Sequence, residues 1–168
     1  MISADYCRTM GRYNRWQNKS LYREADAIGD ASRRADRGAF FASIHGTCAH
    51  LLWGDMIWAS RFDGGPAPEV PGTESATWIT EWDDMKSRRS AMDARIFDWA
   101  TQLSDADLAR DLSWYSGILK RDLARPLALC VAGFFNHQTH HRGQIHAMLT
   151  PAGARPDDTD LILMPDDA

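Results

Sequence analysis

The sequence has little cysteine: its three cysteines, Cys7, Cys48 and Cys130, are odd in number and lie far apart. A disulfide framework would need an even and denser set. Each of the three sits in an apolar stretch with helical spacing, which favours buried, reduced thiols. We therefore expect a protein without disulfides and with a cytoplasmic location.

The chain also lacks a strong charge of one sign, since 19 basic and 23 acidic residues give a formal net charge of −4. This balance argues against nucleic acid or an anionic membrane as the main partner. No apolar run approaches the roughly 18 residues of a membrane span, and the N-terminus has no basic start followed by an apolar segment. We expect a soluble protein with no membrane partner.

Low-complexity segments and repeats of fixed period are absent as well. The chain has 168 residues, of which 44% are apolar and 25% charged, the composition of an ordinary globular protein. Such a composition excludes a disordered chain. We expect a single domain over residues 1–168, large enough to bury a hydrophobic core.

Apolar residues recur at helical spacing in four long stretches. The pattern predicts helices over residues 3–28, 38–62, 76–103 and 126–150. The connections between them are expected to be loops at 29–37 and 63–75, and an irregular excursion or short hairpin at 108–124. Four long helices around one core predict an all-α four-helix bundle, whose helix order the long last connection leaves open.

Further expectations concern the ends of these helices. Ser3 or Asp5 can cap the first helix, and Thr73 or Ser75 the third. Pro126 fits the first turn of the fourth helix, because its ring fixes a helical φ. The apolar run at residues 161–164 is expected to pack on the bundle.

Histidine is concentrated in one place, since four of the six histidines fall within residues 134–146. His137 and His141 are four residues apart, so on a helix they lie one turn apart on the same face. Their neighbours on that face are mostly apolar, so the imidazole nitrogens need polar partners, water or a metal ion. The pair is two metal ligands and not a complete site, and a structural or solvated role is the alternative.

A third histidine, His50, lies in the second expected helix among small neighbours. Gly46, Thr47 and Gly54 occupy three of the four positions that are three or four residues away. Small side chains leave room for another helix or a ligand to approach. We therefore expect His50 to complete a site with His137 and His141, although a lone core histidine is the simpler interpretation.

Three neutral imidazoles suit a divalent transition metal such as Zn²⁺, Ni²⁺, Fe²⁺ or Mn²⁺. The sequence offers no obvious fourth protein ligand, and three ligands with open positions are typical of a catalytic rather than a closed structural site. Bis-histidine haem binding is disfavoured, because a third histidine at the same point would be redundant.

The remaining polar residues near these histidines are given supporting roles. His45, His140 and His146 lie off the faces just described and are expected to be structural, surface or supporting groups. Gln144 and Asn136 can orient a metal ligand or a substrate. The carboxylate at position 55, five residues from His50, is expected to pair with Arg142 or another cation rather than to bind metal.

Two stretches, residues 43–55 (SIHGTCAHLLWGD) and 135–145 (FNHQTHHRGQI), resemble the signature of the DinB/YfiT-like family. The closing segment from Gly153 through Leu161 is similar too, so the resemblance covers essentially the whole chain. It implies a four-helix bundle in up-down-down-up order. It also implies a divalent metal held by His50, His137 and His141.

Relatives of known activity in that superfamily include thiol-dependent S-transferases and a mycothiol-dependent maleylpyruvate isomerase. The resemblance thus implies a metal-dependent S-transferase, in which a low-molecular-weight thiol loses its proton on coordination and attacks an electrophilic small molecule. A metal-dependent hydrolase is the alternative within enzymes, and a non-catalytic metal-binding bundle with a stress-response role is the alternative outside them. Members of the family often pair, and the seven tryptophans favour a homodimer.

Overall fold

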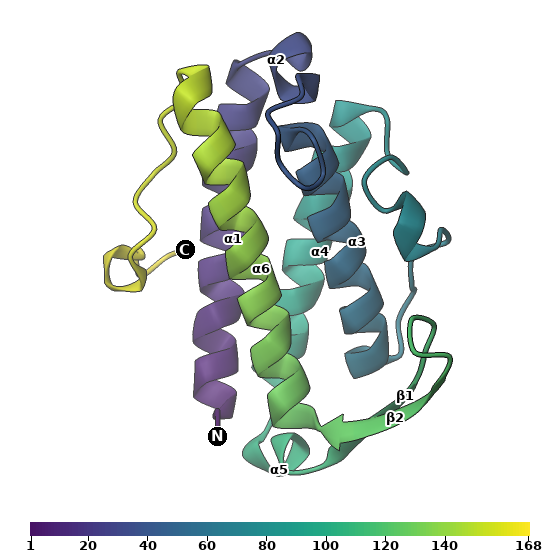
Figure 1. The fold of residues 1–168 in the computed structure, drawn as a ribbon. Helices are drawn as coiled ribbons and strands as arrows, with labels where there is room; N and C mark the ends of the chain where they lie inside the picture. Colours follow the sequence, from purple (N-terminus) through teal and green to yellow (C-terminus); the bar gives the residue numbers. More distant parts are fainter.

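The computed structural model describes residues 1–168 and is mostly helical, with one small hairpin (Figure 1). The long helices are α1 (Ala4–Ala27), α3 (Ile44–Asp63), α4 (Trp82–Gln102) and α6 (Leu127–Leu149). The short helices are α2 (Asp30–Arg34), α5 (Asp105–Leu108), and the 3₁₀ turns η1 (Gly72–Glu74), η2 (Thr150–Ala152) and η3 (Leu161–Leu163). The hairpin pairs β1 (Asp111–Ser116) with β2 (Arg121–Pro126). None of the helices combines the length and the apolar character needed to cross a membrane.

The four long helices lie side by side and enclose one core (Figure 1). Helix α1 packs against α4 and α6, and α3 packs against the same two helices, so that each long helix has two long neighbours. The largest fully buried apolar side chains come from three of the four, namely Ile44, Leu51, Leu52, Met85, Ile96, Phe134, Phe135, Ile145 and Leu149. This core holds α3 and α6, the two histidine-bearing helices, in contact.

Helix α3 begins six residues later than the sequence predicts. Ser43 is its N-cap, and the Ser43 hydroxyl accepts a hydrogen bond from the backbone N–H of Gly46 at 3.0 Å. Ala42, just before it, has a left-handed backbone with φ of 59°. Phe40 and Phe41 therefore lie in an irregular segment before the helix, where their helical spacing in the sequence has no meaning.

Helix α4 also begins six residues later than predicted, at Trp82. Neither Thr73 nor Ser75 caps it, since η1 and an irregular segment separate them from its first turn. Trp78, expected on the face of this helix, instead donates its indole N–H to the carbonyl oxygen of Ala49 at 3.0 Å. Ser3, in contrast, caps α1 as predicted, by accepting from the N–H of Tyr6 at 3.1 Å.

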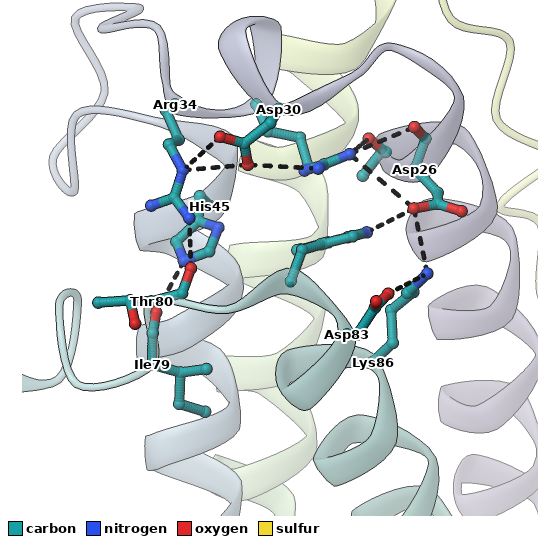
Figure 2. Close-up of polar contacts among 11 residues, drawn as sticks. Asp26, Asp30, Arg34, His45, Ile79, Thr80, Asp83 and Lys86 are labelled. Carbon is teal, nitrogen blue, oxygen red and sulfur yellow. Dashed lines mark hydrogen bonds and ion pairs between the residues drawn. The ribbon is translucent and has the colours of Figure 1, made fainter.

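The connection predicted as a loop at residues 29–37 contains the short helix α2. Figure 2 shows why this turn is fixed: Arg34 reaches the Asp30 carboxylate at 2.9 Å and also the carbonyl oxygen of Thr80. Asp26, at the end of α1, accepts from Lys86 of α4 at 3.2 Å. Charged contacts between distant segments thus order a stretch whose own sequence carries no helical periodicity.

The long connection before α6 contains the hairpin that the sequence left as one of two options. Its strands are antiparallel, with Asp111 opposite Pro126 and Ser116 opposite Arg121. Pro126 is the last residue of β2 and the N-cap of α6, so it precedes the helix instead of lying in its first turn. In the C-terminal segment, Ile162 is 90% exposed and only Met164 packs against the core, so the predicted packing of residues 161–164 is wrong for most of the run.

Candidate metal centre

The structure brings together three imidazoles from two helices: His50 from α3, and His137 and His141 from α6. One ring nitrogen from each histidine lies within 4.8 Å of the other two. The ring centroids are 4.4 Å apart for the pair on α6, and His50 lies 5.5 Å from His137 and 4.7 Å from His141. Residues 87 positions apart in the chain therefore meet because α3 and α6 pack on each other.

Gly54 is the small residue that makes room for this meeting. A β-carbon built at Gly54 would lie 2.6 Å from Cε1 of His137, closer than real side chains approach each other. Gly54 therefore leaves the space that the His137 ring occupies, as expected of a small neighbour of His50. Gly46 serves another purpose, because a β-carbon there would lie 2.5 Å from the carbonyl oxygen of Phe41.

The His50 ring is oriented by Ser75, which lies in the segment between α3 and α4. The Ser75 hydroxyl donates its proton to the carbonyl oxygen of Gly72 at 2.7 Å. Because its proton is used there, the hydroxyl oxygen can only accept a hydrogen bond from Nδ1 of His50, which lies 2.9 Å away. Nδ1 of His50 must carry the proton, and Nε2 is left with a free lone pair.

The same logic fixes the tautomer of His141. Its Nδ1 lies 2.8 Å from Oε1 of Gln144, one turn further along α6, and a carboxamide oxygen can only accept. Nδ1–H of His141 therefore donates, and Nε2 keeps its lone pair. Gln144 thus has the orienting role that its spacing predicts, whereas Asn136 is exposed and has no hydrogen bond to the histidines.

All three rings are uncharged near neutral pH. Burial, reinforced by the neighbouring imidazoles, lowers the pKa of His50 to about 4. Burial likewise lowers the pKa of His141 to about 4, against the opposing effect of its bond to Gln144. The pKa of His137 is lowered for the same main reason. Neutral imidazoles are the form that binds metal ions.

The spacing and the chemistry of the three imidazoles are compatible with metal binding. Nδ1 of His137 is buried without any hydrogen-bond partner, an arrangement that costs free energy unless something satisfies the ring. Metal–imidazole bonds of about 2.1 Å place tetrahedral ligand atoms roughly 3.4 Å apart. A spacing of up to 4.8 Å comes within that range by small side-chain rotations. The donor set suits a first-row divalent ion better than Ca²⁺ or Mg²⁺, which prefer oxygen.

Aromatic side chains lie against the cluster. The Phe41 ring stacks on His50 with centroids 3.9 Å apart and an interplanar angle of 22°, and it lies 5.7 Å from His141. Trp53 lies parallel to His50 at 6.4 Å. A hollow of about 490 Å³, which none of the three histidines lines, is bordered by Phe41. Phe41 thus lies against two of the three histidines.

A buried charged network lies next to the cluster. Asp55 is fully buried and accepts from Arg89 at 2.6 Å and from the side-chain amide of Gln138 at 3.0 Å. The carboxylate therefore pairs with a cation and does not join the histidines, as predicted, but the cation is Arg89 and not Arg142. Arg142 instead donates to Asn14 of α1.

The other three histidines lie outside the cluster. His45 is buried, and its Nε2 donates to the carbonyl oxygen of Ile79 at 2.8 Å, which is a structural role (Figure 2). His140 is exposed, and His146 is partly buried on another side of α6. Ser75 and Phe41 are the site residues that the sequence did not reveal, because both come from irregular segments without periodicity. Only the turn-forming Gly/Pro composition before Ser75 marks that region as non-helical.

The protein's own thiols are unsuited to chemistry at this site. Cys7, Cys48 and Cys130 are free and buried, as predicted. Burial raises the pKa of Cys7 to about 11 and that of Cys48 to about 12, and it raises that of Cys130 as well. At neutral pH they remain protonated, so any thiolate at the site has to come from another molecule.

Fold and site together define a helical protein with a candidate three-histidine metal centre between two of its long helices. The chain belongs to the DinB family, whose model matches residues 1–168. It is similar to Protein DinB of Bacillus subtilis (strain 168), with 26% identity over 164 residues that cover 94% of this chain and 92% of that protein. No solved structure gives a significant match.

Proposed function

We propose that His50, His137 and His141 bind one divalent transition metal ion. The observation that carries the proposal is the convergence of three neutral imidazoles, two of which have their Nδ1–H groups held by Ser75 and Gln144. Hydrogen bonds of this kind fix the tautomer and ring direction of metal-ligating histidines. Zn²⁺, Ni²⁺, Fe²⁺ and Mn²⁺ are the ions to be compared.

The test is a metal titration of untagged, metal-free protein, followed by competition with a chromophoric chelator. We expect one ion per chain and a melting temperature that rises with metal occupancy, because an ion that bridges α3 and α6 binds only the folded state. A stoichiometry near zero for all four ions would contradict the proposal.

We further propose that the metal-loaded protein is a thiol S-transferase. When bound, the ion would lower the pKa of a coordinated low-molecular-weight thiol, so that the thiolate is available at neutral pH. The protein contributes three uncharged ligands and leaves the remaining positions open. The Phe41 ring lies against His50 and near His141, and in this proposal it moves when a thiol or an electrophile enters.

The Phe41 ring that stacks on His50 also favours a second candidate, a non-catalytic metal-binding protein with a stress-response role. Both candidates share the metal site and differ in whether its outer side opens. A metal-dependent hydrolase would need the same opening.

A pair of matched variants separates the candidates. Phe41→Ala removes the ring stacked on His50, whereas Phe40→Ala removes a neighbouring ring that is 87% exposed. For an enzyme whose lid is Phe41, we expect Phe41→Ala to change KM for the thiol, and Phe40→Ala to leave it unaltered. Conjugation of a chromogenic electrophile with several cellular thiols gives the rate. No metal-stimulated turnover with any thiol, in wild type or in Phe41→Ala, would exclude the transferase and leave metal binding intact.

We also propose that α1, α3, α4 and α6 form the up-down-down-up bundle that the resemblance implies, within one domain over residues 1–168. The packing of each long helix on two others and the course of the ribbon in Figure 1 support this order. A homodimer, which light scattering can test, is supported by exposed apolar side chains such as Ile118 and Leu129. The free cysteines favour a cytoplasmic location.

A further inference from the structure

Three arginine side chains of this protein are almost fully buried, and one of them differs from the other two. Arg33 lies 3.3 Å from the Asp30 carboxylate. Arg89 lies 2.6 Å from Asp55 and 2.8 Å from Asp93. Arg142 is 4% exposed and has no carboxylate within ion-pair distance. A buried charge without a direct counter-ion is costly, and this cost needs an explanation.

The contacts of Arg142 are all with uncharged groups. Nη1 donates to the side-chain oxygen of Asn14, and Nη2 lies 3.4 Å from the Thr139 hydroxyl. The guanidinium carbon lies 5.3 Å from the centre of the Tyr13 ring. A guanidinium has five N–H groups, so these contacts leave most of its hydrogen-bonding capacity unused.

The nearby carboxylates are already engaged. The side-chain amide of Asn14 stands between Arg142 and Asp93, and it donates to the Asp93 carboxylate at 3.0 Å. Asp93 also accepts from Asn18 and pairs with Arg89, which in turn pairs with Asp55. In formal charge, Asp55 and Asp93 balance Arg89 and Arg142. Both carboxylates, however, lie beside Arg89. Arg142 is the cation at the edge of the network.

This edge borders a hollow of about 400 Å³ between α1 and α6. The polar residues that line it are Tyr13, Gln17, Thr139, Arg142, His146 and Thr159. No aspartate or glutamate side chain lines it, and none of the three clustered histidines does. Nδ1 of His146 is buried without a hydrogen-bond partner. The hollow thus combines a buried cation and an unpartnered imidazole nitrogen, and no carboxylate lines it. The hydroxyls of Tyr13 and Thr139 already donate to the carbonyl oxygens of Thr159 and Phe135, so the guanidinium and the imidazole are the groups left for a ligand.

We propose that this hollow binds the carboxylate or phosphate group of a small molecule, with Arg142 as its anchor and His146 as a second contact. Guanidinium groups bind oxyanions through paired N–H donors, and burial strengthens such bonds. The site is separate from the metal centre and does not depend on metal being bound there.

The test is an NMR titration of ¹⁵N-labelled protein with inorganic phosphate and with succinate, each at constant ionic strength set by chloride. We expect saturable shifts of the amides around residues 139–146 and 159 with at least one of the two probes. The probe that binds distinguishes a phosphate ligand from a carboxylate ligand. The His137→Ala variant is expected to keep this binding, which separates it from anion binding at a metal ion.

Two variants locate the anchor. Arg142→Lys keeps the charge but loses the paired donors, and we expect binding to weaken about tenfold or more. His146→Ala lies outside the buried network and is expected to weaken it by about threefold to tenfold. Lys120→Gln, at the exposed tip of the hairpin, is the control for general charge and is expected to have no effect.

Two outcomes would overturn the proposal. One is the absence of saturable shifts with either probe. The other is unchanged affinity in His146→Ala together with unchanged affinity in Arg142→Lys. If Arg142→Lys fails to fold, which circular dichroism would show, unchanged binding by His146→Ala alone overturns it.

Discussion

Helix α3 carries two histidines five residues apart that serve different purposes. At the corner around α2, His45 donates to the carbonyl oxygen of Ile79, and the charged groups nearby meet opposite charges, as Arg34 meets Asp30 (Figure 2). At the cluster with α6, His50 faces two other imidazoles and no carboxylate. At the corner Nδ1 of His45 is buried without a partner, but no second imidazole or carboxylate of a metal-binding group lies beside it, whereas the cluster brings three neutral imidazoles together. A binding site for a cation is indicated by that difference and not by histidine content alone.

The sharpest way to test this comparison is to remove one histidine from each region. We expect His137→Ala to abolish stoichiometric metal binding and to remove the difference in melting temperature between metal-loaded and chelator-treated protein. His45→Ala should keep one metal per chain and lower the free energy of unfolding by about 1–3 kcal/mol, because the carbonyl group of Ile79 loses its donor. Metal analysis and thermal melting with and without chelator measure both. Equal metal loss in the two variants would remove the distinction.

The next largest effect is expected where the packing of the cluster is tightest. Gly54→Ala would place a methyl group 2.6 Å from Cε1 of His137, so the ring has to turn away from its partners. We expect metal affinity to fall by about 10- to 100-fold, comparable to the loss of an orienting contact. Gly133→Ala is the matched control on α6, since a β-carbon there meets no atom within 4 Å. Competition titrations give both affinities, and equal values would show that Gly54 is not required for the geometry.

A smaller effect is expected from the groups that hold the rings. Ser75→Ala and Gln144→Ala each remove the acceptor for an Nδ1–H group and free the ring to change tautomer and direction. We expect about a tenfold loss of metal affinity for each. Ser75→Ala also removes the donor to the carbonyl oxygen of Gly72 and should lower the free energy of unfolding of metal-free protein by about 1–3 kcal/mol. The same competition titration measures it, with Asn136→Ala as an exposed control on α6. Unaltered affinity in both variants would mean that the metal itself fixes the rings.

The smallest effect concerns the dependence of stability on pH at the α2 corner. Burial lowers the pKa of His45 below its ordinary value, against the opposing effect of its bond to Ile79. The unfolded chain takes up this proton near pH 6.5, about the ordinary pKa of histidine, and the folded chain only at lower pH. The unfolded state therefore binds more protons in that window, and this contribution to stability falls as the pH drops below about 6.5.

We expect His45→Gln to reduce the loss of unfolding free energy between pH 7.5 and pH 5.5, as measured by urea unfolding of metal-free protein. A slope in His45→Gln that equals the wild-type slope would show that His45 is not the titrating group.

Apolar periodicity predicted the helices correctly where the backbone is regular. The core faces of α1 and α6 follow the apolar spacing, and the four-residue spacing of His137 and His141 places them on one face. The starts of α3 and α4 could not be predicted in this way, because Ser43 ends the irregular segment by capping and because residues 76–81 adopt no helix despite their apolar content. Helix α2 contains the local ion pair between Asp30 and Arg34, and Arg34 also contacts Thr80, which lies in a segment far away in the sequence.

The sequence by itself determined that the protein is helical, that its thiols are buried, and which helical face carries the histidine pair, because these properties follow from local spacing and composition. Tertiary packing alone decided that His50 meets that pair, that Ser75 orients His50, and that Phe41 stacks on His50. It also decided that Arg89 and not Arg142 pairs with Asp55, which leaves Arg142 without a carboxylate at the edge of a hollow. The physical reason is that hydrogen bonds and ion pairs depend on distances between groups that the chain separates by dozens of residues.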